Sequence, residues 1–311
     1  MTTAFEKMKS LRGKRSLEKL TEQIEKQQNK GYSKNDERVW KLERDKAGNG
    51  TALIRFLPLS PQDIEIDPNH PPYVRMYSHA FQGPTGQWYI ENSLTTKNQN
   101  DPVSELNTEL WNSGQKAQAR AQKRKLRYTA NILVLKDPAN PENEGKVFLY
   151  EFGKKIFDKI KDAMFPESDA LREIEPVNPF CPWTGADFEL RVRQVDGYAN
   201  YDKSTFSEPT ELFDGDETKI EEVYNSEYSL LEIVSDDKFK TYDELKTKLQ
   251  TVLGSSTGQK KTEVEITAST NTQEASGEED VDADDFSDLD DDITSDVGDI
   301  DSLISELDGE V

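Results

Sequence analysis

The chain has 311 residues, enough for one large domain or two modest ones and for a substantial hydrophobic core. Its hydrophobic content is 33%, or about 35% when glycine is counted in place of tyrosine. Ordinary globular chains contain roughly 45–50%, so part of this chain is expected not to fold. The 61 acidic and 39 basic residues give a net charge of −22, which by itself argues against a polyanionic ligand.

The negative charge is concentrated at one end of the chain. Residues 262–311 contain 19 acidic residues and no lysine or arginine, and residues 161–261 hold 12 basic and 22 acidic residues. Residues 1–160 contain 27 basic and 20 acidic residues. We therefore expect an acidic tail and a basic surface in the first half of the chain.

The single cysteine, Cys181, excludes an intramolecular disulfide and a zinc site built from several thiolates, and it fits a reducing cytoplasm. The first ten residues contain no apolar signal-peptide core, and no apolar run approaches the roughly 20 residues of a membrane span. These features predict a soluble intracellular protein.

The N-terminal region is predicted to form a short amphipathic helix. Ser16 suits the N-cap, Leu17, Leu20 and Ile24 recur at helical spacing, and Gly31 supplies a stop. The basic run just before this helix is typical either of a solvated helix entrance or of a docking arm, and the sequence leaves both open.

From about Val39 the chain is predicted to be mainly β, because short segments rich in β-branched and aromatic residues alternate with glycine, proline and asparagine clusters. The pattern suits a small, partly open barrel as well as a sandwich. Helical insertions are expected at 103–125 and 154–164, and residues 208–253 are expected to be mainly helical. The predicted strands lie within 51–59, 87–92, 128–138, 146–155 and 188–201.

Beyond Gly254 the composition is polar and lacks periodicity, so order is expected to end there. The last dozen residues alone carry apolar residues at helical spacing beside acidic ones. They are predicted to form an amphipathic helix in a partner's groove, and the alternative is a solvating disordered tail. The residues concerned are Asp299, Ile300, Leu303, Ile304 and Leu307.

Enzyme signatures are mostly absent. The chain has no glycine-rich phosphate loop, no dinucleotide fingerprint, no nucleophile elbow and only two histidines, His70 and His79. An aspartate run that starts at Asp280 begins like a calcium loop, but Asp285 stands where that loop requires glycine. Catalysis and calcium binding are therefore not expected.

Basic and aromatic residues are interleaved in the middle of the chain. Between Leu110 and Lys136 there are seven basic residues and no acidic ones, and Tyr128 follows the densest basic run. Single-stranded nucleic acid requires both features, because cations follow the phosphates while exposed rings stack on unpaired bases for about 1–3 kcal/mol each. The alternative is that the rings are core and the cations a solvated face.

Several long strings, in this order, resemble the single-stranded DNA-binding protein family of T-even-type bacteriophages: KRSLEKL, VWKLERDKAGNGTALIRFLP, GQWYIEN, YTANILVLKDPANPENEGKVFLYEFGKKIFDKI and CPWTGADFELRVRQVDGYANYD. The resemblance covers residues 12–205 well. It implies a basic helical arm for cooperativity over residues 1–31, and a DNA-binding core of oligonucleotide/oligosaccharide-binding (OB) type over 32–253. It also implies a linker and disordered acidic tail that binds partners over 254–311.

The resemblance also implies site residues. The arm's protomer-contact motif falls on Arg12, Lys14, Arg15 and Ser16, with Gly13 interrupting the family's longer basic run. Thr129 stands where the family often has tryptophan. Together with the basic and aromatic pattern, the resemblance gives the expected DNA contacts as Arg55, Trp88, Tyr89, Arg120, Lys123, Arg124, Lys125, Arg127, Tyr128, Tyr150, Lys154, Tyr198 and Tyr201.

The best-known members of the family bind structural zinc through one histidine and three cysteines. His79 stands at the place of the histidine, but Glu91–Ser93 and Asp101–Ser104 stand where the thiols are expected. Hydroxyl and amide groups replace thiolate poorly, so we expect no zinc and no other cofactor. Packing or local helix is expected to stabilise residues 92–112, and Cys181 is expected to be a buried thiol.

The resulting hypothesis is a cooperative, sequence-independent single-stranded DNA-binding protein, not an enzyme, that acts in phage replication, recombination and repair in the cytoplasm of the infected bacterium. Its expected partners are single-stranded DNA, other copies of itself, and phage polymerase, helicase or helicase loader, recombinase and recombinase mediator. One alternative is an acidic chaperone or DNA mimic that binds basic proteins. The other is a metal-dependent nuclease that uses the abundant carboxylates.

Overall fold

The computed structural model describes residues 36–166, 175–195 and 197–254. The chain divides into two compact units, residues 1–39 and 40–311. In the first unit the described residues, 36–39, include a turn in which the Arg38 guanidinium lies 2.8 Å from the Asp36 carboxylate. The predictions for the N-terminal arm and the acidic tail lie outside the described residues.

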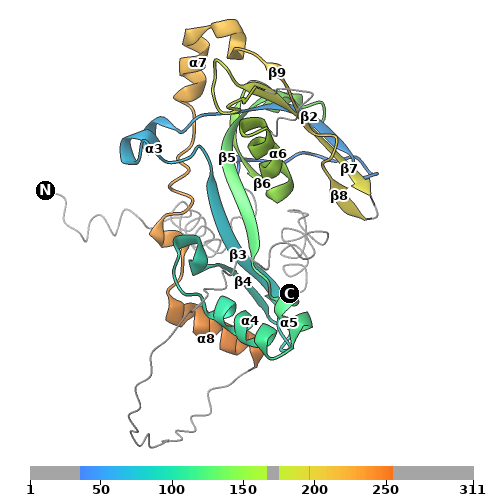
Figure 1. Cartoon of the computed structure of the whole chain (residues 1–311), viewed down its shortest axis with the longest axis vertical. Coiled ribbons are helices and arrows are strands. Elements are labelled where there is room, and N and C mark those ends of the chain that lie inside the picture. The colour runs from blue at the N-terminus through green and yellow to red at the C-terminus, as the bar shows by residue number, and fades with distance from the viewer. Residues whose placement is uncertain (1–35, 167–174, 196, 255–311) are drawn as a thin grey trace, which may run out of the picture. The chain divides into compact units, whose positions relative to one another are not determined.

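The second unit is built on a β-sheet. The strand pairs described below are antiparallel. β5 is its longest strand, 12 residues or about 40 Å, and it pairs with β3 through residues 125–129 and with β2 through residues 132–136 (Figure 1). β6 flanks β5, and β7 lies on the other side of β2, followed by β8. The strands are β1 (Val39–Trp40), β2 (Gly50–Phe56), β3 (Val74–Gln82), β4 (Trp88–Asn92), β5 (Lys125–Lys136), β6 (Val147–Phe152), β7 (Ala186–Val195), β8 (Tyr198–Asn200) and β9 (Thr205–Pro209).

Helices fill the connections and cover the sheet. Two of them have clear sequence signals, since Asp101 caps the helix that Pro102 begins, and Thr241 forms a capping box with Glu244. The α-helices are α3 (Pro61–Ile66), α4 (Pro102–Asn112), α5 (Lys116–Ala121), α6 (Lys154–Met164), α7 (Glu217–Tyr224) and α8 (Tyr242–Leu253). The 3₁₀ helices are η1 (Leu94–Lys97), η2 (Pro141–Asn143), η3 (Leu212–Gly215) and η4 (Asp236–Lys238).

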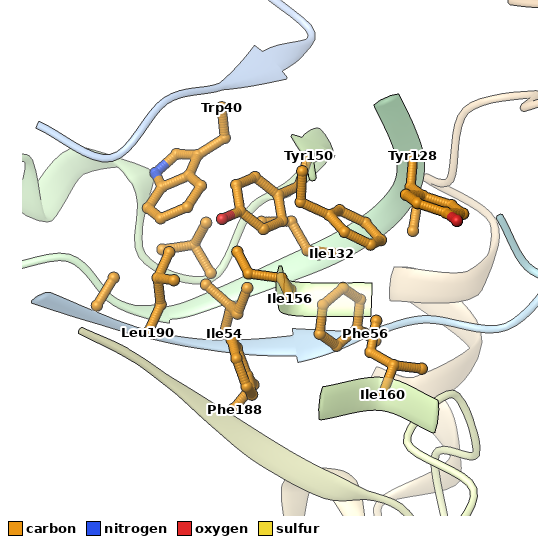
Figure 2. Packing of buried hydrophobic residues seen from close by; sticks show 14 of the residues in the cluster. Trp40, Ile54, Phe56, Tyr128, Ile132, Tyr150, Ile156, Ile160, Phe188 and Leu190 are labelled. Carbon is orange, nitrogen blue, oxygen red and sulfur yellow. The ribbon is translucent and has the colours of Figure 1, made fainter. Parts of the chain in front are cut away.

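The main core lies between the β2–β5–β6–β7 sheet and α6 and is rich in aromatic rings (Figure 2). The ring of Phe56 has its centroid 5.7–6.2 Å from the rings of four other phenylalanines. Ile156 and Ile160, one helical turn apart on α6, are buried against the same cluster. Figure 2 shows Tyr128 at the edge of this packing, next to the sheet region that β3 shares with β5.

A second, smaller core joins the β3–β4 hairpin to α4 and α8. Phe81 and Tyr89 stack with their ring centroids 5.1 Å apart, and Leu245 and Leu249 of α8 pack in the same cluster. Gly83 has no room for a side chain, because a Cβ there would lie 2.2 Å from the Val252 carbonyl oxygen. The hairpin therefore packs directly against the end of α8.

The structure confirms the mainly β class with helical insertions. The helix predicted at 154–164 is α6, and the one predicted at 103–125 is two helices separated at Gly114, whose φ of +84° suits glycine. β3 was not among the predicted strands. The OB-type barrel stays a prediction. Among the described residues, no helix is both long and apolar enough to span a membrane.

A buried carboxyl group connects α3 with the segment that follows α7. Asp63 of α3 accepts hydrogen bonds from the Ser229 hydroxyl and the Leu230 N–H, both at 2.6 Å. Glu227 is buried nearby, and neither of its carboxyl oxygens has a hydrogen-bond partner among the described residues. Burial, reinforced by the charge of Asp63, raises the pKa of Glu227 to about 9.

This raised pKa predicts a pH dependence of stability. The unfolded carboxyl ionises near its ordinary value of 4.5, so the stability linked to Glu227 is full below that pH and is lost as the pH rises through 9. The substitution Glu227→Gln removes the ionisation and should raise the Tm by more than about 3 °C at pH 8, and by less at pH 5. Exposed Glu222 on α7 supplies the control, because Glu222→Gln should leave the Tm unchanged; equal gains at both pH values would contradict the assignment.

Candidate nucleic-acid interface

The basic run lies next to aromatic residues because β3 pairs with the first residues of β5. In that ladder Arg75 lies opposite Tyr128 and Tyr77 opposite Leu126. Directly opposed residues of an antiparallel pair project from the same face of the sheet. One face of the ladder therefore alternates rings and cations.

Tyr77 and Arg124 form a cation–π pair on this face. The guanidinium carbon of Arg124 lies 4.2 Å from the centroid of the Tyr77 ring. Both side chains are half-buried, and Arg75, two residues before Tyr77, is exposed. Stacked guanidinium groups and tyrosine rings offer flat surfaces to a base and positive charge to a phosphate.

Tyr128 is the buried residue of this face. Its ring stacks on Phe157 of α6 with centroids 4.0 Å apart and planes 8° apart, and Tyr73 packs edge-on against both rings. Burial raises the pKa of Tyr128 to about 12, with the neighbouring tyrosines Tyr77 and Tyr73 adding to the effect. The hydroxyl therefore stays neutral and adds no negative charge to the face.

We call Tyr73, Arg75, Tyr77, Arg124 and Tyr128 the β3–β5 strip. Further cations lie around it on α6, where Lys154 is exposed and 3.6 Å from Asp158. On the opposite face of the ladder, Arg127 lies 3.5 Å from Glu151 and Lys125 lies opposite Ser78.

A second group of cations surrounds Trp111 on α4. The Lys116 ammonium is 4.9 Å and the Arg120 guanidinium 5.8 Å from the centroid of the Trp111 ring. α5, which carries both cations, ends just before Lys123, so the positive charge continues from Trp111 to the strip.

Of the other predicted residues, the structure places Trp88 away from the strip. Trp88 pairs with Gln82 at the far end of β3, four residues or about 14 Å beyond Ser78, and lines a groove beside the acidic first turn of α8. Tyr198 is 52% exposed on β8, and Tyr201 packs partly against the main core.

Comparison with known proteins agrees with what the geometry of this surface indicates. A family model described as "gp32 DNA binding protein like" matches residues 48–253. The single-stranded DNA-binding protein of Enterobacteria phage T4 is 45% identical over 231 residues, covering 73% of both chains. That of Enterobacteria phage T2 is 44% identical over 229 residues, covering 72% of both. The chain belongs to the gp32-like family.

Two tyrosines expected to contact DNA are core residues of this gp32-like protein. Tyr89 is fully buried, and burial, with the charges of Asp101 and Glu91, raises its pKa well above the usual value. Tyr150 is 6% exposed with its ring edge-on to Trp40 at 5.4 Å, and Figure 2 shows it inside the main core. Their place in the fold corrects the expectation of direct base stacking, because neither ring has a free face.

Arg55 is also a correction. Its side chain is 1% exposed, with Nη1 donating to the Asp187 carboxylate at 3.0 Å. Nη2 donates to the carbonyl oxygens of Cys181 at 3.1 Å and Thr210 at 2.8 Å. The guanidinium therefore links β2 to the loop before β7 instead of facing a ligand. Cys181, expected to be buried, is half-buried.

The sequence analysis missed Tyr73, Arg75 and Tyr77. They lie on or beside β3, which follows a proline-rich segment and mixes polar with apolar residues, so β3 was not predicted. The alternation of Tyr73, Arg75 and Tyr77 at a spacing of two is the signal that would have placed them on one face of a strand.

The role assigned to Arg55 predicts a loss of stability. Arg55→Met removes a buried guanidinium that donates to the Asp187 carboxylate and to the Cys181 and Thr210 carbonyl oxygens, and should lower the free energy of unfolding by about 3–5 kcal/mol in urea titrations. Arg191 of β7, which lies 2.7 Å from Glu189 with a 55% exposed side chain, is the matched control. Arg191→Met should cost less than about 1 kcal/mol; similar costs for the two variants would refute the role.

Proposed function

We propose that the chain binds single-stranded DNA without sequence preference, with the β3–β5 strip as the central part of its binding surface. The proposal rests on the cation–π pair of Arg124 and Tyr77. On the same face, exposed Arg75 lies opposite buried Tyr128. Rings of this kind stack on any unpaired base, and the cations follow the phosphates. The names of the T4 and T2 relatives support the same ligand.

The mechanism follows from the chemistry of the strip. Each cation that neutralises a phosphate releases a counterion, so the logarithm of affinity falls by about 0.7 per phosphate for each unit of log salt. Paired bases stack on one another in a duplex and cannot stack on Tyr77, so the strip favours single strands. Packing of Tyr128 and Phe157 fixes the rings in advance and reduces the entropy lost on binding.

The proposal extends to the parts of the chain outside the described residues. Residues 1–31 bind the neighbouring protomer and make DNA binding cooperative. Residues 254–311 recruit phage replication and recombination proteins and compete with DNA for the basic surface. The chain thus coats single strands during replication, recombination and repair in the cytoplasm of the infected bacterium.

The alternatives explain less of the molecule. An acidic chaperone or DNA mimic accounts for the tail but not for the acid-free stretch that ends in the strip. A nuclease needs carboxylates gathered around a metal, and within the described ranges no three His, Cys, Asp or Glu side chains are grouped to hold one. We therefore propose a binding protein without catalytic activity.

Substitutions in the strip test the proposal directly. Tyr77→Ala should weaken binding to oligo-dT by about 5–100-fold, since a stack is worth about 1–3 kcal/mol. Arg124→Ala should weaken binding and reduce the slope of log affinity against log salt by about 0.7. Both are measured by fluorescence quenching over a salt series.

Matched controls for these two changes lie on α7. Tyr224→Ala removes the same side chain as Tyr77→Ala, and Lys219→Ala likewise removes one positive charge, on an acidic helix that packs against η3. Both should leave DNA binding unchanged. Affinity that is indifferent to salt, or strip variants that bind as well as the α7 variants, would refute the proposed surface.

The tail proposal makes a separate prediction. Deleting residues 262–311 removes 19 acidic residues that compete with DNA at the high local concentration set by the linker. The deletion should tighten binding to oligo-dT on the order of tenfold at low salt, and should abolish capture of the phage helicase loader or recombinase mediator. Unchanged affinity together with unchanged capture would leave the tail as a solvating segment only.

A further inference from the structure

A buried polar cluster lies between β3, η1 and α4, at the positions where the family's zinc ligands are expected. His79 of β3 and Asp101, the N-cap of α4, are each 1% exposed, and Ser93, the N-cap of η1, is fully buried. We call His79, Ser93, Asp101 and Ser104 the His79 cluster.

Both nitrogens of the His79 ring face hydrogen-bond acceptors. Nδ1 lies 3.0 Å from the backbone oxygen of Gln122, and a carbonyl oxygen only accepts, so Nδ1 carries a hydrogen. Nε2 lies 3.4 Å from Oδ1 of Asp101, an ion-pair contact longer than a well-formed hydrogen bond. Nε2 makes no hydrogen bond within the described part of the fold, and the charged group that it faces is the Asp101 carboxylate.

Asp101 is held as a carboxylate by donors from two elements. Its Oδ1 accepts from the backbone N–H groups of Val103 and Ser104 at 3.0 and 3.1 Å, and its Oδ2 accepts from the N–H of Leu94 at 3.1 Å. Burial raises the pKa of Asp101, but the contact with His79 and the hydrogen bonds from Ser104 and Ser93 outweigh it and bring the pKa to about 2. One negative charge therefore stays buried beside the ring.

The other carboxylate near the ring already has cations of its own. Glu91 lies opposite His79 in the β3–β4 ladder. Its Oε1 pairs with the ammonium groups of Lys240 and Lys248 from the α8 side, the latter at 2.6 Å. Asp101 is therefore the carboxylate left to face the His79 ring.

The residues of the cluster do not fit a tetrahedral zinc ion. Such a site takes four ligands from thiolates, imidazoles and carboxylates, and Ser93 and Ser104 supply hydroxyl groups instead. The one cysteine, Cys181, contributes its carbonyl oxygen to Arg55 in another part of the fold. Two side chains of the right chemistry remain in the cluster, His79 and Asp101, and two ligands are too few for such a site.

We infer that the buried His79–Asp101 pair takes the place of zinc as a metal-free clasp that joins β3 to η1 and α4. The Gln122 carbonyl, which also accepts from Asn107 at 3.0 Å, is held by the same ring. Gln122 immediately precedes the basic run, so the clasp fixes where Arg124 enters β5. In this respect the inference rests on the proposed function, and His79 is a positioning residue for the β3–β5 strip.

A pair of histidine substitutions in the full chain tests the clasp. His79→Gln keeps a donor for the Gln122 carbonyl but removes the ring that faces the buried Asp101 carboxylate. The variant should lower the Tm on the order of 10 °C, and amide exchange of residues 93–125 should be faster. His70 is the matched control, because it is half-buried and its Nδ1 lies 2.7 Å from the neighbouring Pro71 oxygen. His70→Gln should shift the Tm by less than about 2 °C.

Metal analysis and ring spectroscopy complete the test. After dialysis against micromolar zinc, the parent chain should carry no stoichiometric zinc, and a chelator should leave its Tm unchanged. Nitrogen-15 spectra should show a hydrogen on Nδ1 of His79, the nitrogen that faces the Gln122 carbonyl oxygen. One zinc ion per chain, a chelator-sensitive Tm, a ring without a hydrogen on Nδ1 or equal effects of the two histidine variants would overturn the clasp.

Measuring oligo-dT binding by the parent chain and by His79→Gln distinguishes failure of the clasp from failure of the proposed function. If His79→Gln weakens oligo-dT binding on the order of tenfold with an unchanged salt slope, the positioning role is supported, since no phosphate contact has been lost. Unchanged DNA binding with a lowered Tm would refute that role and keep the clasp. Failure of the parent chain to bind oligo-dT would refute the proposed function while the metal, spectroscopic and stability measurements still decide the clasp.

Discussion

The fold depends on one strand that belongs to two ladders. β5 bonds to β3 through its first residues and to β2 through its last, with β6 pairing along its middle. Backbone groups within a sheet must find partners, so this double pairing fixes the β3–β4 hairpin relative to the main core in a single register. A shift of one residue would turn every side chain of β5 to the opposite face.

The same strand extends from the main core to the candidate binding surface. Alternate residues of β5 project from one face, so Ile132 in the main core and Tyr128 at its edge follow one another along the strand, and half-buried Arg124 immediately precedes it. Tyr128 is packed below by Phe157 and lies opposite Arg75. The binding surface is thus an extension of the core, and its rings are held in place by the packing that stabilises the fold.

Local sequence patterns predicted the elements whose signals lie within one segment. The β-branched run of β5, the bounds of α6 with Ile156 and Ile160 one turn apart, and the basic residues before Tyr128 are all of this kind. β3 was missed, because its pairing partner lies about 50 residues further along the chain and nothing local shows that Tyr77 will meet Arg124.

Which cations are buried and which are exposed could not be predicted from the sequence either. Arg55 lies between Ile54 and Phe56 and Arg124 between Lys123 and Lys125, and neither pattern shows what the guanidinium contacts. The partners of Arg55 lie 126–155 residues away in sequence, and only the fold brings them to its guanidinium. The missing thiols, in contrast, were visible in the sequence, while the ion pair between His79 and Asp101 in their place required the structure.

The location of the bound strand is the most direct test of this account. Photocrosslinking of the full chain to an oligo-dT that carries halogenated bases, followed by mass spectrometry of the crosslinked peptides, reports which residues touch the bases. The account predicts crosslinks at Tyr73 or Tyr77 and within 124–128. Crosslinks confined to the grooves beside α8, with none on β3 or the start of β5, would contradict it.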